Sequence, residues 1–326
     1  MQSHAKSVTA NEAEGDPVMG TALRPEPREL TGVQVVFQTP FTEDGQLDMA
    51  TLESQLDWLF AEGADGIVFA MVSEILRLSS EERDQVTIAA CKSAESRGDS
   101  IISVGAESVT TAIRHARVAA DAGATALMAA PPSLFRVDND SLLRYYLAIA
   151  EAVALPLVVQ DASGYVGAPL SIDLQARLYR ELGDLAYFKP EAPPIGPRVT
   201  LLREQTGNGA RIFEGTGGLY LIDSFRRGAV GTMPAGDLVW ALVPLWRALV
   251  EGNFDYAYRI AGPLTQIVSL QTSLDSFVAI EKRNLVRQGI FPTATMRQPT
   301  GEVIDVQMVE EVARLVDLLR AAVASV

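Results

Sequence analysis

The sequence predicts an α/β protein, a (β/α)8 TIM barrel followed by a C-terminal helical region. From Gly32 onward, short β-prone apolar runs alternate with longer segments of helical periodicity, and eight such runs fit within about 200 residues. After Ala235 the alternation stops and only helical periodicity continues. We therefore predict a flexible N-terminal tail at residues 1–28, the barrel at residues 29–235 and the helical region at residues 236–326.

The eight predicted strands are the apolar runs at residues 33–38, 66–69, 101–104, 126–129, 155–160, 186–189, 211–214 and 229–233. Segments of helical periodicity follow at residues 48–61, 79–96, 109–122, 138–153, 171–182, 196–206 and 219–227. Ser79 and Glu82 have the spacing of a capping box at the start of the second helix. Strands separated by helices pair in parallel through right-handed crossovers, and eight of them fit a closed barrel.

An open doubly wound sheet is the competing arrangement. Its usual G-x-G-x-x-G motif after the first strand is absent. The glycine-rich run at residues 215–218 is typical of a tight turn more often than of a phosphate cradle. The last helical segments lie at residues 238–251, 254–271, 277–288 and 306–324, and we expect them to pack on the barrel or on a sister subunit.

Composition excludes several classes of function. A formal net charge of −14 and a pI near 4.7 argue against nucleic acid or an anionic membrane as partner, because either requires a basic face. The single cysteine, Cys91, excludes an internal disulfide, and its helical context indicates a packed small side chain. His4 and His115 lie far apart, without the spacing of metal ligands. No apolar run reaches the roughly 18 residues of a membrane span, and residues 1–28 lack a secretion signal, so we expect a cytoplasmic protein.

The lysines are few and one of them is unusual. Lys6 lies in the polar tail, and Lys92 and Lys282 lie in charge-rich helical segments, where we expect them at the surface. Lys189 instead ends an apolar run and precedes Pro190, which stops regular structure. A lysine in apolar surroundings has a depressed pKa and can attack a carbonyl as the neutral amine. The alternative is a strand-end lysine that extends to solvent.

In (β/α)8 barrels the functional groups lie at the C-terminal ends of the strands. Lys189 is the only amine among the residues that this rule selects. They are Pro40, Met71 to Glu74, Glu107, Pro131 to Phe135, Gln160 to Tyr165, Lys189 to Glu191, Gly215 to Gly217 and Met233.

Several short motifs follow one another along the chain. They are Gly32-Val33, Thr39-Pro40-Phe41, Ser73-Glu74 with Leu78, Glu81-Glu82-Arg83, Val104-Gly105, Asp121-Ala122-Gly123-Ala124, Pro131-Pro132, Phe188-Lys189 and Lys282-Arg283-Asn284. In order and spacing they resemble the dihydrodipicolinate synthase and N-acetylneuraminate lyase family, from about Gly32 to the C-terminus. The resemblance implies a barrel with a C-terminal helical region, usually a homotetramer, that acts on 2-oxo acids without cofactor or metal. It also implies that Lys189 forms a Schiff base with pyruvate or another 2-oxo acid.

The sequence departs from the family pattern at three places near this lysine. The turn after the second strand reads Ala70-Met71-Val72-Ser73-Glu74 where the family has Gly-Thr-Thr-Gly-Glu, so the relay hydroxyl is lost at Val72 unless Ser73 replaces it. The relay tyrosine of the family aligns with Leu134, which cannot transfer a proton. Tyr165 stands near the arginine that binds a distal carboxylate in dihydrodipicolinate synthases.

We therefore predict Lys189 as the catalytic amine, with Tyr165 and Glu191 as candidate acid/base groups. Tyr165 could instead pack at the barrel mouth, Glu191 could be a solvated loop carboxylate, and Glu74 reads as structural support. The predicted substrate-binding residues are Met71, Val72, Ser73, Leu134, Tyr165 and Met233.

The leading hypothesis is a lyase, an aldolase or dehydratase acting on a sugar-acid-like or aromatic-substituted 2-oxo acid. The alternatives are a true dihydrodipicolinate synthase, which uses pyruvate and aspartate semialdehyde, and a non-catalytic 2-oxo acid-binding barrel. We expect no nucleic-acid or membrane partner and a homo-oligomer, either tetramer or dimer.

Overall fold

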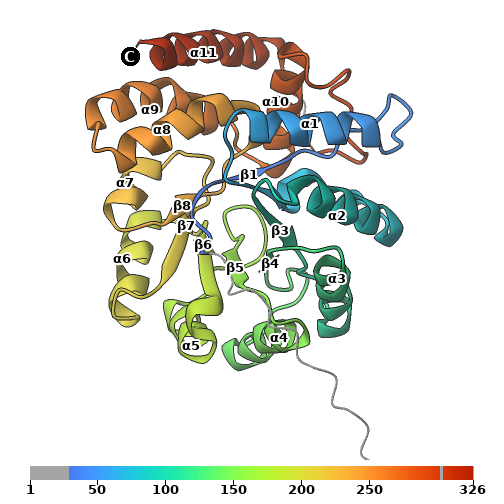
Figure 1. The fold of residues 1–326 in the computed structure, drawn as a ribbon, viewed down its shortest axis with the longest axis vertical. Coiled ribbons are helices and arrows are strands. Elements are labelled where there is room, and N and C mark those ends of the chain that lie inside the picture. Colours follow the sequence, from blue (N-terminus) through green and yellow to red (C-terminus); the bar gives the residue numbers. More distant parts are fainter. Residues whose placement is uncertain (1–28, 302–303, 326) are drawn as a thin grey trace, which may run out of the picture.

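Eight parallel strands close into a barrel in the part of the chain that the structure describes (Figure 1). This computed structural model describes residues 29–301 and 304–325, so the predicted tail at residues 1–28 lies outside the described residues. The strands pair in sequence order, and β8 pairs with β1 to close the barrel. They are β1 Gly32–Val36, β2 Gly66–Phe69, β3 Asp99–Ser103, β4 Ala126–Ala129, β5 Leu157–Asp161, β6 Ala186–Pro190, β7 Arg211–Glu214 and β8 Gly231–Thr232. The predicted fold class is therefore confirmed.

A layer of helices surrounds the strands (Figure 1). It consists of α1 Met49–Ala61, α2 Ser80–Ala94, α3 Val109–Asp121, α4 Asn139–Ala152, α5 Ile172–Leu182, α6 Ile195–Gln205 and α7 Leu221–Arg226. Each of the first five helices begins with a capping side chain that accepts a hydrogen bond from a backbone N–H group of the first turn. The capping residues are Asp48, Ser79, Ser108, Asp138 and Ser171. The predicted capping box of α2 is confirmed, because Ser79 N–H also donates to Glu82 Oε2 at 2.8 Å.

Side chains alternate between two cores along each strand. Those that point outward pack against the helices, and those that point inward fill the barrel. The inward cluster consists of Leu30, Val36, Val68, Ala70, Ile101, Ala126, Met128, Val158, Tyr187, Phe213 and Met233. These apolar side chains occupy the middle of the barrel, and in (β/α)8 barrels the functional groups lie at the C-terminal ends of the strands.

The C-terminal helices pack on the barrel and on one another. They are α8 Val239–Val250, α9 Phe254–Ser269, α10 Leu274–Arg287 and α11 Val306–Ala324. α8 packs against β1, and α9 lies between α8 and α11 at the top of Figure 1. α10 contacts two short 3-10 helices at the strand ends, η1 Met71–Ser73 after β2 and η4 Gly236–Leu238 after β8. The C-terminal region therefore reaches the face of the barrel that carries the predicted site.

Element boundaries differ from the prediction by a few residues. α10 begins at Leu274, before the predicted position 277, because Ser273 and Ser276 form a capping box that the apolar pattern does not show. Cys91 is buried in the core, and burial raises its pKa to about 11, as expected of a packed thiol. Among the described residues, no helix is long and apolar enough to cross a membrane.

Candidate active site

Strand β6 carries Lys189 to the C-terminal end of the barrel. Tyr187 belongs to the cluster inside the barrel, so alternation along the strand directs Lys189 inward as well. The side chain of Lys189 is 5% exposed, and its Nζ donates a hydrogen bond to Glu191 Oε1 at 2.9 Å. A buried amine thus lies beside a buried carboxyl group at the position where barrel enzymes carry catalytic groups.

Glu191 is a buried residue and not a solvated loop carboxylate. Its N–H donates to Asp161 O at 3.1 Å, which extends the pairing of β5 and β6 past Pro190. Its Oε2 accepts a hydrogen bond from Gln160 Nε2 at 2.8 Å. Burial raises the pKa of Glu191, while the Lys189 charge and the Gln160 and Lys189 hydrogen bonds oppose the increase. A carboxyl group in this setting can accept and return a proton at the lysine nitrogen.

Glycines leave the space that this pair occupies. A Cβ atom on Gly215, directly after β7, would lie 2.8 Å from Lys189 Cγ and 2.9 Å from Glu191 Cγ. A Cβ atom on Gly164 would lie 2.8 Å from the carbonyl oxygen of Glu191. The glycine-rich run at residues 215–218 therefore provides close packing beside Lys189.

The turn after β2 is held by Ser73. Ser73 is fully buried, and its hydroxyl donates to Phe37 O at 2.5 Å and accepts the Ala70 N–H at 3.2 Å. Thr39 Oγ1 donates to the Ser73 carbonyl at 2.6 Å. The Ser73 hydroxyl is thus already engaged in fixing the turn, and this argues against its use as a replacement proton relay. Met71 and Val72 in the same turn are half-buried.

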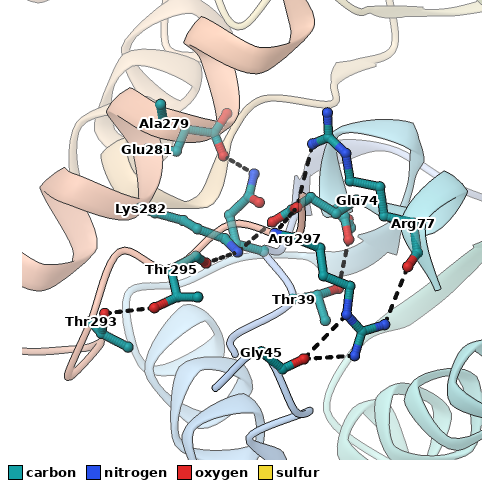
Figure 2. Close-up of polar contacts among 12 residues, drawn as sticks. Thr39, Gly45, Glu74, Arg77, Ala279, Glu281, Lys282, Thr293, Thr295 and Arg297 are labelled. Atoms are coloured by element: carbon teal, nitrogen blue, oxygen red, sulfur yellow. Dashed lines mark hydrogen bonds and ion pairs between the residues drawn. The ribbon is translucent and has the colours of Figure 1, made fainter. Parts of the chain in front are cut away.

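An ion pair joins this turn to α10 (Figure 2). Lys282 Nζ donates to Glu74 Oε1 and, at 2.8 Å, to Thr295 O. The second carboxylate oxygen of Glu74 accepts the Arg297 N–H at 3.0 Å. Both side chains of the ion pair are 0% exposed, so the prediction that Lys282 lies at the surface is wrong. Its charge-rich segment turns one face inward, where the lysine has a carboxylate partner. Glu74 gives structural support, as predicted.

Tyr165 lies near the Lys189 pair and also packs against α10. Its ring contacts Phe277 edge-on, with centroids 6.3 Å apart. Burial raises the pKa of Tyr165, and the charges of Glu191, Glu281 and Glu214 add to the increase. The phenol therefore stays protonated beside three carboxyl groups. Both predicted roles, packing at the mouth and proton transfer, are compatible with this position.

The remaining predicted contacts are spread over different places. Leu134 is 76% exposed and lines a cavity of about 630 Å³ between the loops after β4 and β5. Neither Lys189 nor Glu191 lines that cavity. Met233 is buried in the cluster inside the barrel. The structure thus brings Lys189, Glu191 and Tyr165 together and leaves Leu134 outside this group.

A set of buried polar residues that the sequence did not predict lies where the end of β1, η4 and α10 meet. Gln38 donates from its amide to Glu281 Oε2, and Asn284 Nδ2 donates to Asp237 Oδ2 at 2.7 Å. All four side chains are buried. Gln38 at the end of an apolar strand was the one available signal, because the partners on α10 looked like ordinary helical surface residues.

Comparisons with known proteins agree on one family. Residues 29–318 match the model of the dihydrodipicolinate synthetase family. The L-2-keto-3-deoxyarabonate dehydratase of Azospirillum brasilense is 30% identical over 232 residues, which cover 70% of this chain and 75% of the dehydratase. The 4-hydroxy-tetrahydrodipicolinate synthase of Azoarcus sp. is 34% identical over 187 residues, which cover 57% of this chain and 63% of the synthase.

A solved structure shows the same fold. The dihydrodipicolinate synthase of Rhodopseudomonas palustris superposes with a TM-score of 0.82 at 24% identity. The superposition covers 91% of this chain and 100% of the synthase chain.

Proposed function

This chain belongs to the dihydrodipicolinate synthetase family and is a lyase of that family, and from this premise we propose that Lys189 forms a Schiff base with its 2-oxo acid substrate. We further propose that the reaction is the dehydration of a 2-oxo-3-deoxy sugar acid. The observation that carries the Schiff-base proposal is the buried hydrogen bond of 2.9 Å between Lys189 Nζ and Glu191 Oε1.

Glu191 accounts for the proton transfers at nitrogen. It accepts a proton from Nζ, and the neutral amine then attacks C2 of the 2-oxo acid and forms the C–N bond. The carbonyl electron pair moves to oxygen, which takes up a proton while the nitrogen gives one up, and the product is a neutral carbinolamine. Glu191 donates a proton to the departing hydroxyl group as the nitrogen lone pair expels it as water. The product is an iminium ion on Lys189, beside a carboxylate that Gln160 stabilises.

The iminium ion supplies the electron sink for the next steps. Removal of a proton from C3 sends the C–H electron pair toward the nitrogen and gives an enamine. The enamine then expels the hydroxyl group at C4, which leaves as water after it receives a proton. Hydrolysis of the resulting imine releases the product and regenerates Lys189. Glu191, a carboxylate again once the iminium ion has formed, is our candidate base at C3. Tyr165 is our candidate acid for the C4 hydroxyl group, because its protonated phenol lies near Glu191, which can then return a proton to it.

Two features favour dehydration of a sugar acid over dihydrodipicolinate synthesis. Tyr165 stands where a synthase has an arginine for a distal carboxylate, and a phenol does not form the same bidentate contact. The A. brasilense relative, matched over 75% of its length, is a dehydratase of a 2-oxo-3-deoxy sugar acid. Aldol cleavage shares the enamine and is the second outcome that the chemistry allows.

Borohydride trapping with intact-mass measurement tests the Schiff base. We expect pyruvate to leave a reduced adduct on the wild-type protein and none on Lys189→Ala, with Lys92→Ala as the matched control that keeps the adduct. Absence of the wild-type adduct would refute the proposal, and an adduct without turnover of any 2-oxo-3-deoxy sugar acid would favour a non-catalytic binding barrel. Robust turnover of pyruvate with aspartate semialdehyde would favour a synthase.

We also propose that the chain acts as a homo-oligomer, dimer or tetramer, in the cytoplasm. Leu134 and Phe135 support the assembly, because these neighbouring apolar side chains are 76% and 70% exposed. Light scattering of the wild type and of Leu134→Ser/Phe135→Ser tests it. We expect the double variant to have the lower mass.

A further inference from the structure

Gln38 and Glu281 form a buried polar pair at the mouth of the barrel. Gln38 lies two residues beyond Val36, whose side chain points into the barrel, so alternation directs Gln38 inward at the C-terminal end of β1. Its amide nitrogen donates to Glu281 Oε2, and both residues are 0% exposed. Glu281 lies on α10, next to the ion pair between Lys282 and Glu74 (Figure 2). A carboxyl group from the C-terminal region thus contacts a side chain of the barrel interior.

Each member of the pair has an oxygen atom without a partner. Among the described residues, neither Gln38 Oε1 nor Glu281 Oε1 makes a hydrogen bond, although both atoms are buried. A buried acceptor without a partner is unfavourable, and native proteins rarely leave two of them side by side unless water or a ligand completes them. The unpaired atoms therefore point to a hydrogen-bond donor that binds here.

Tyr165 connects the pair to the Lys189 site. Phe277, one turn before Glu281 on α10, contacts the ring of Tyr165. The charges of Glu191 and Glu281 both raise the pKa of the Tyr165 phenol. Tyr165 therefore lies close to Glu191 at the lysine and to Glu281 on α10.

The surroundings of Glu281 fit a neutral carboxyl group. Burial and the nearby Asp237 raise its pKa well above the ordinary value, against the opposing effects of Gln38 and Lys282. Asn284 holds one oxygen of Asp237 at 2.7 Å. A neutral carboxyl group both donates and accepts hydrogen bonds, and the amide oxygen of Gln38 accepts them. A hydroxyl group, which also does both, complements this pair.

We propose that Gln38 and Glu281 form a subsite that binds a hydroxyl group of the substrate beyond C3, and so select a hydroxylated 2-oxo acid. The proposal rests on the proposed function, because it needs the 2-oxo acid to be attached to Lys189. It assigns to the C-terminal helical region a direct part in substrate recognition.

Reductive trapping at varied ligand concentration tests the subsite. The probes are 2-oxo-3-deoxy-L-arabonate, which carries hydroxyl groups at C4 and C5, and 2-oxobutanoate, which carries none. The variant is Gln38→Leu/Glu281→Leu, which removes both polar groups together and so leaves neither unpaired. We expect its half-saturating concentration to rise about tenfold for the sugar acid and to stay within about twofold of wild type for 2-oxobutanoate.

Arg287→Ala is the control on the same helix. Arg287 pairs with Asp317 of α11 at the surface, and we expect this variant to keep the wild-type ratio of the two half-saturating concentrations. Retention of 2-oxobutanoate trapping by the double variant shows that it folds. An equal rise for both acids, or no rise for the sugar acid, overturns the subsite while the Schiff base stands. A wild type that traps neither pyruvate nor 2-oxobutanoate overturns the proposed function and the subsite together.

Discussion

Lys282 of α10 donates a hydrogen bond to Glu74, which lies in the turn after β2, and both side chains are fully buried. Glu74 has φ of 58°, a left-handed backbone conformation that is unfavourable for a residue with a side chain. Lys282, the Arg297 N–H and Arg77 hold the Glu74 carboxylate in place. The C-terminal region thereby fixes the turn that contains Met71 and Val72, two of the predicted substrate contacts.

Loss of Lys282 should destabilise the protein. Lys282→Met removes the buried ammonium group that pairs with the Glu74 carboxylate, and we expect the free energy of unfolding to fall by about 3–5 kcal/mol. The measurement is urea denaturation followed by circular dichroism. Glu74→Gln/Lys282→Met removes both charges and should be less destabilised than the sum of the two single variants. Additive effects in this cycle would show that the two side chains do not interact.

Glu191→Gln should slow formation of the Schiff base. The amide oxygen can still accept a hydrogen bond from Lys189, but the amide cannot accept a proton, so we expect the trapping rate to fall by about 10²–10⁴-fold. The rate is measured by adding borohydride at successive times after mixing with pyruvate and quantifying the reduced adduct. Glu311→Gln on α11 is the control. Because burial raises the pKa of Glu191, the wild-type rate should decline as the pH falls and the carboxylate becomes protonated. A variant with an unchanged rate and pH profile would exclude Glu191 from proton transfer.

Gly215→Ala should disturb the catalytic pair. The added methyl group would lie 2.8 Å from Lys189 Cγ and 2.9 Å from Glu191 Cγ, so one of them must move. We expect trapping to slow by roughly tenfold to a hundredfold. Gly262→Ala is the matched control, because a Cβ atom there meets nothing within 4 Å and the residue lies inside α9. That change should leave trapping intact and stabilise the fold by about 0.5–1 kcal/mol.

Asp237→Asn should change how stability depends on pH. Burial raises the pKa of Asp237 from 3.8 to about 7, so between these values the folded protein binds more protons than the unfolded chain. Its contribution to the free energy of unfolding therefore falls as the pH rises through this window. Asparagine does not titrate, so the variant should gain stability relative to wild type between pH 5 and about 7. The measurement is the urea midpoint of both proteins at pH 5 and at pH 7. The same difference in midpoint between variant and wild type at the two pH values would contradict this prediction.

Tyr165→Phe should separate binding from turnover. The ring can keep its contact with Phe277, whereas the phenolic proton is lost. We expect pyruvate trapping to persist and kcat for a 2-oxo-3-deoxy sugar acid to fall by about 10²-fold or more. Tyr165→Leu adds the loss of the ring contact and is the comparison for packing. Unchanged kcat in the phenylalanine variant would leave Tyr165 with a packing role alone.

Much of the fold could be read from the sequence, because hydrophobic periodicity reports burial one element at a time. Strand β6 illustrates this: an apolar run that ends on Lys189 predicted both the strand and the position of the amine at its end. The order of eight such runs then defined the barrel. Boundaries such as the start of α10 were less accurate, since the capping pair of Ser273 and Ser276 sets them and not the apolar pattern.

The sequence by itself therefore determined the barrel, its C-terminal helices and the candidate amine, Lys189. Only the tertiary structure decided which charged groups are buried together. Glu74 and Lys282 lie 208 residues apart in the chain, and Gln38 and Glu281 lie 243 apart, yet each pair is in contact. No local pattern records such pairs, because a helical charge looks the same in the sequence whether it faces solvent or a partner. Burial and partner are properties of the packed chain, and they are what distinguish the neighbourhood of Lys189 here.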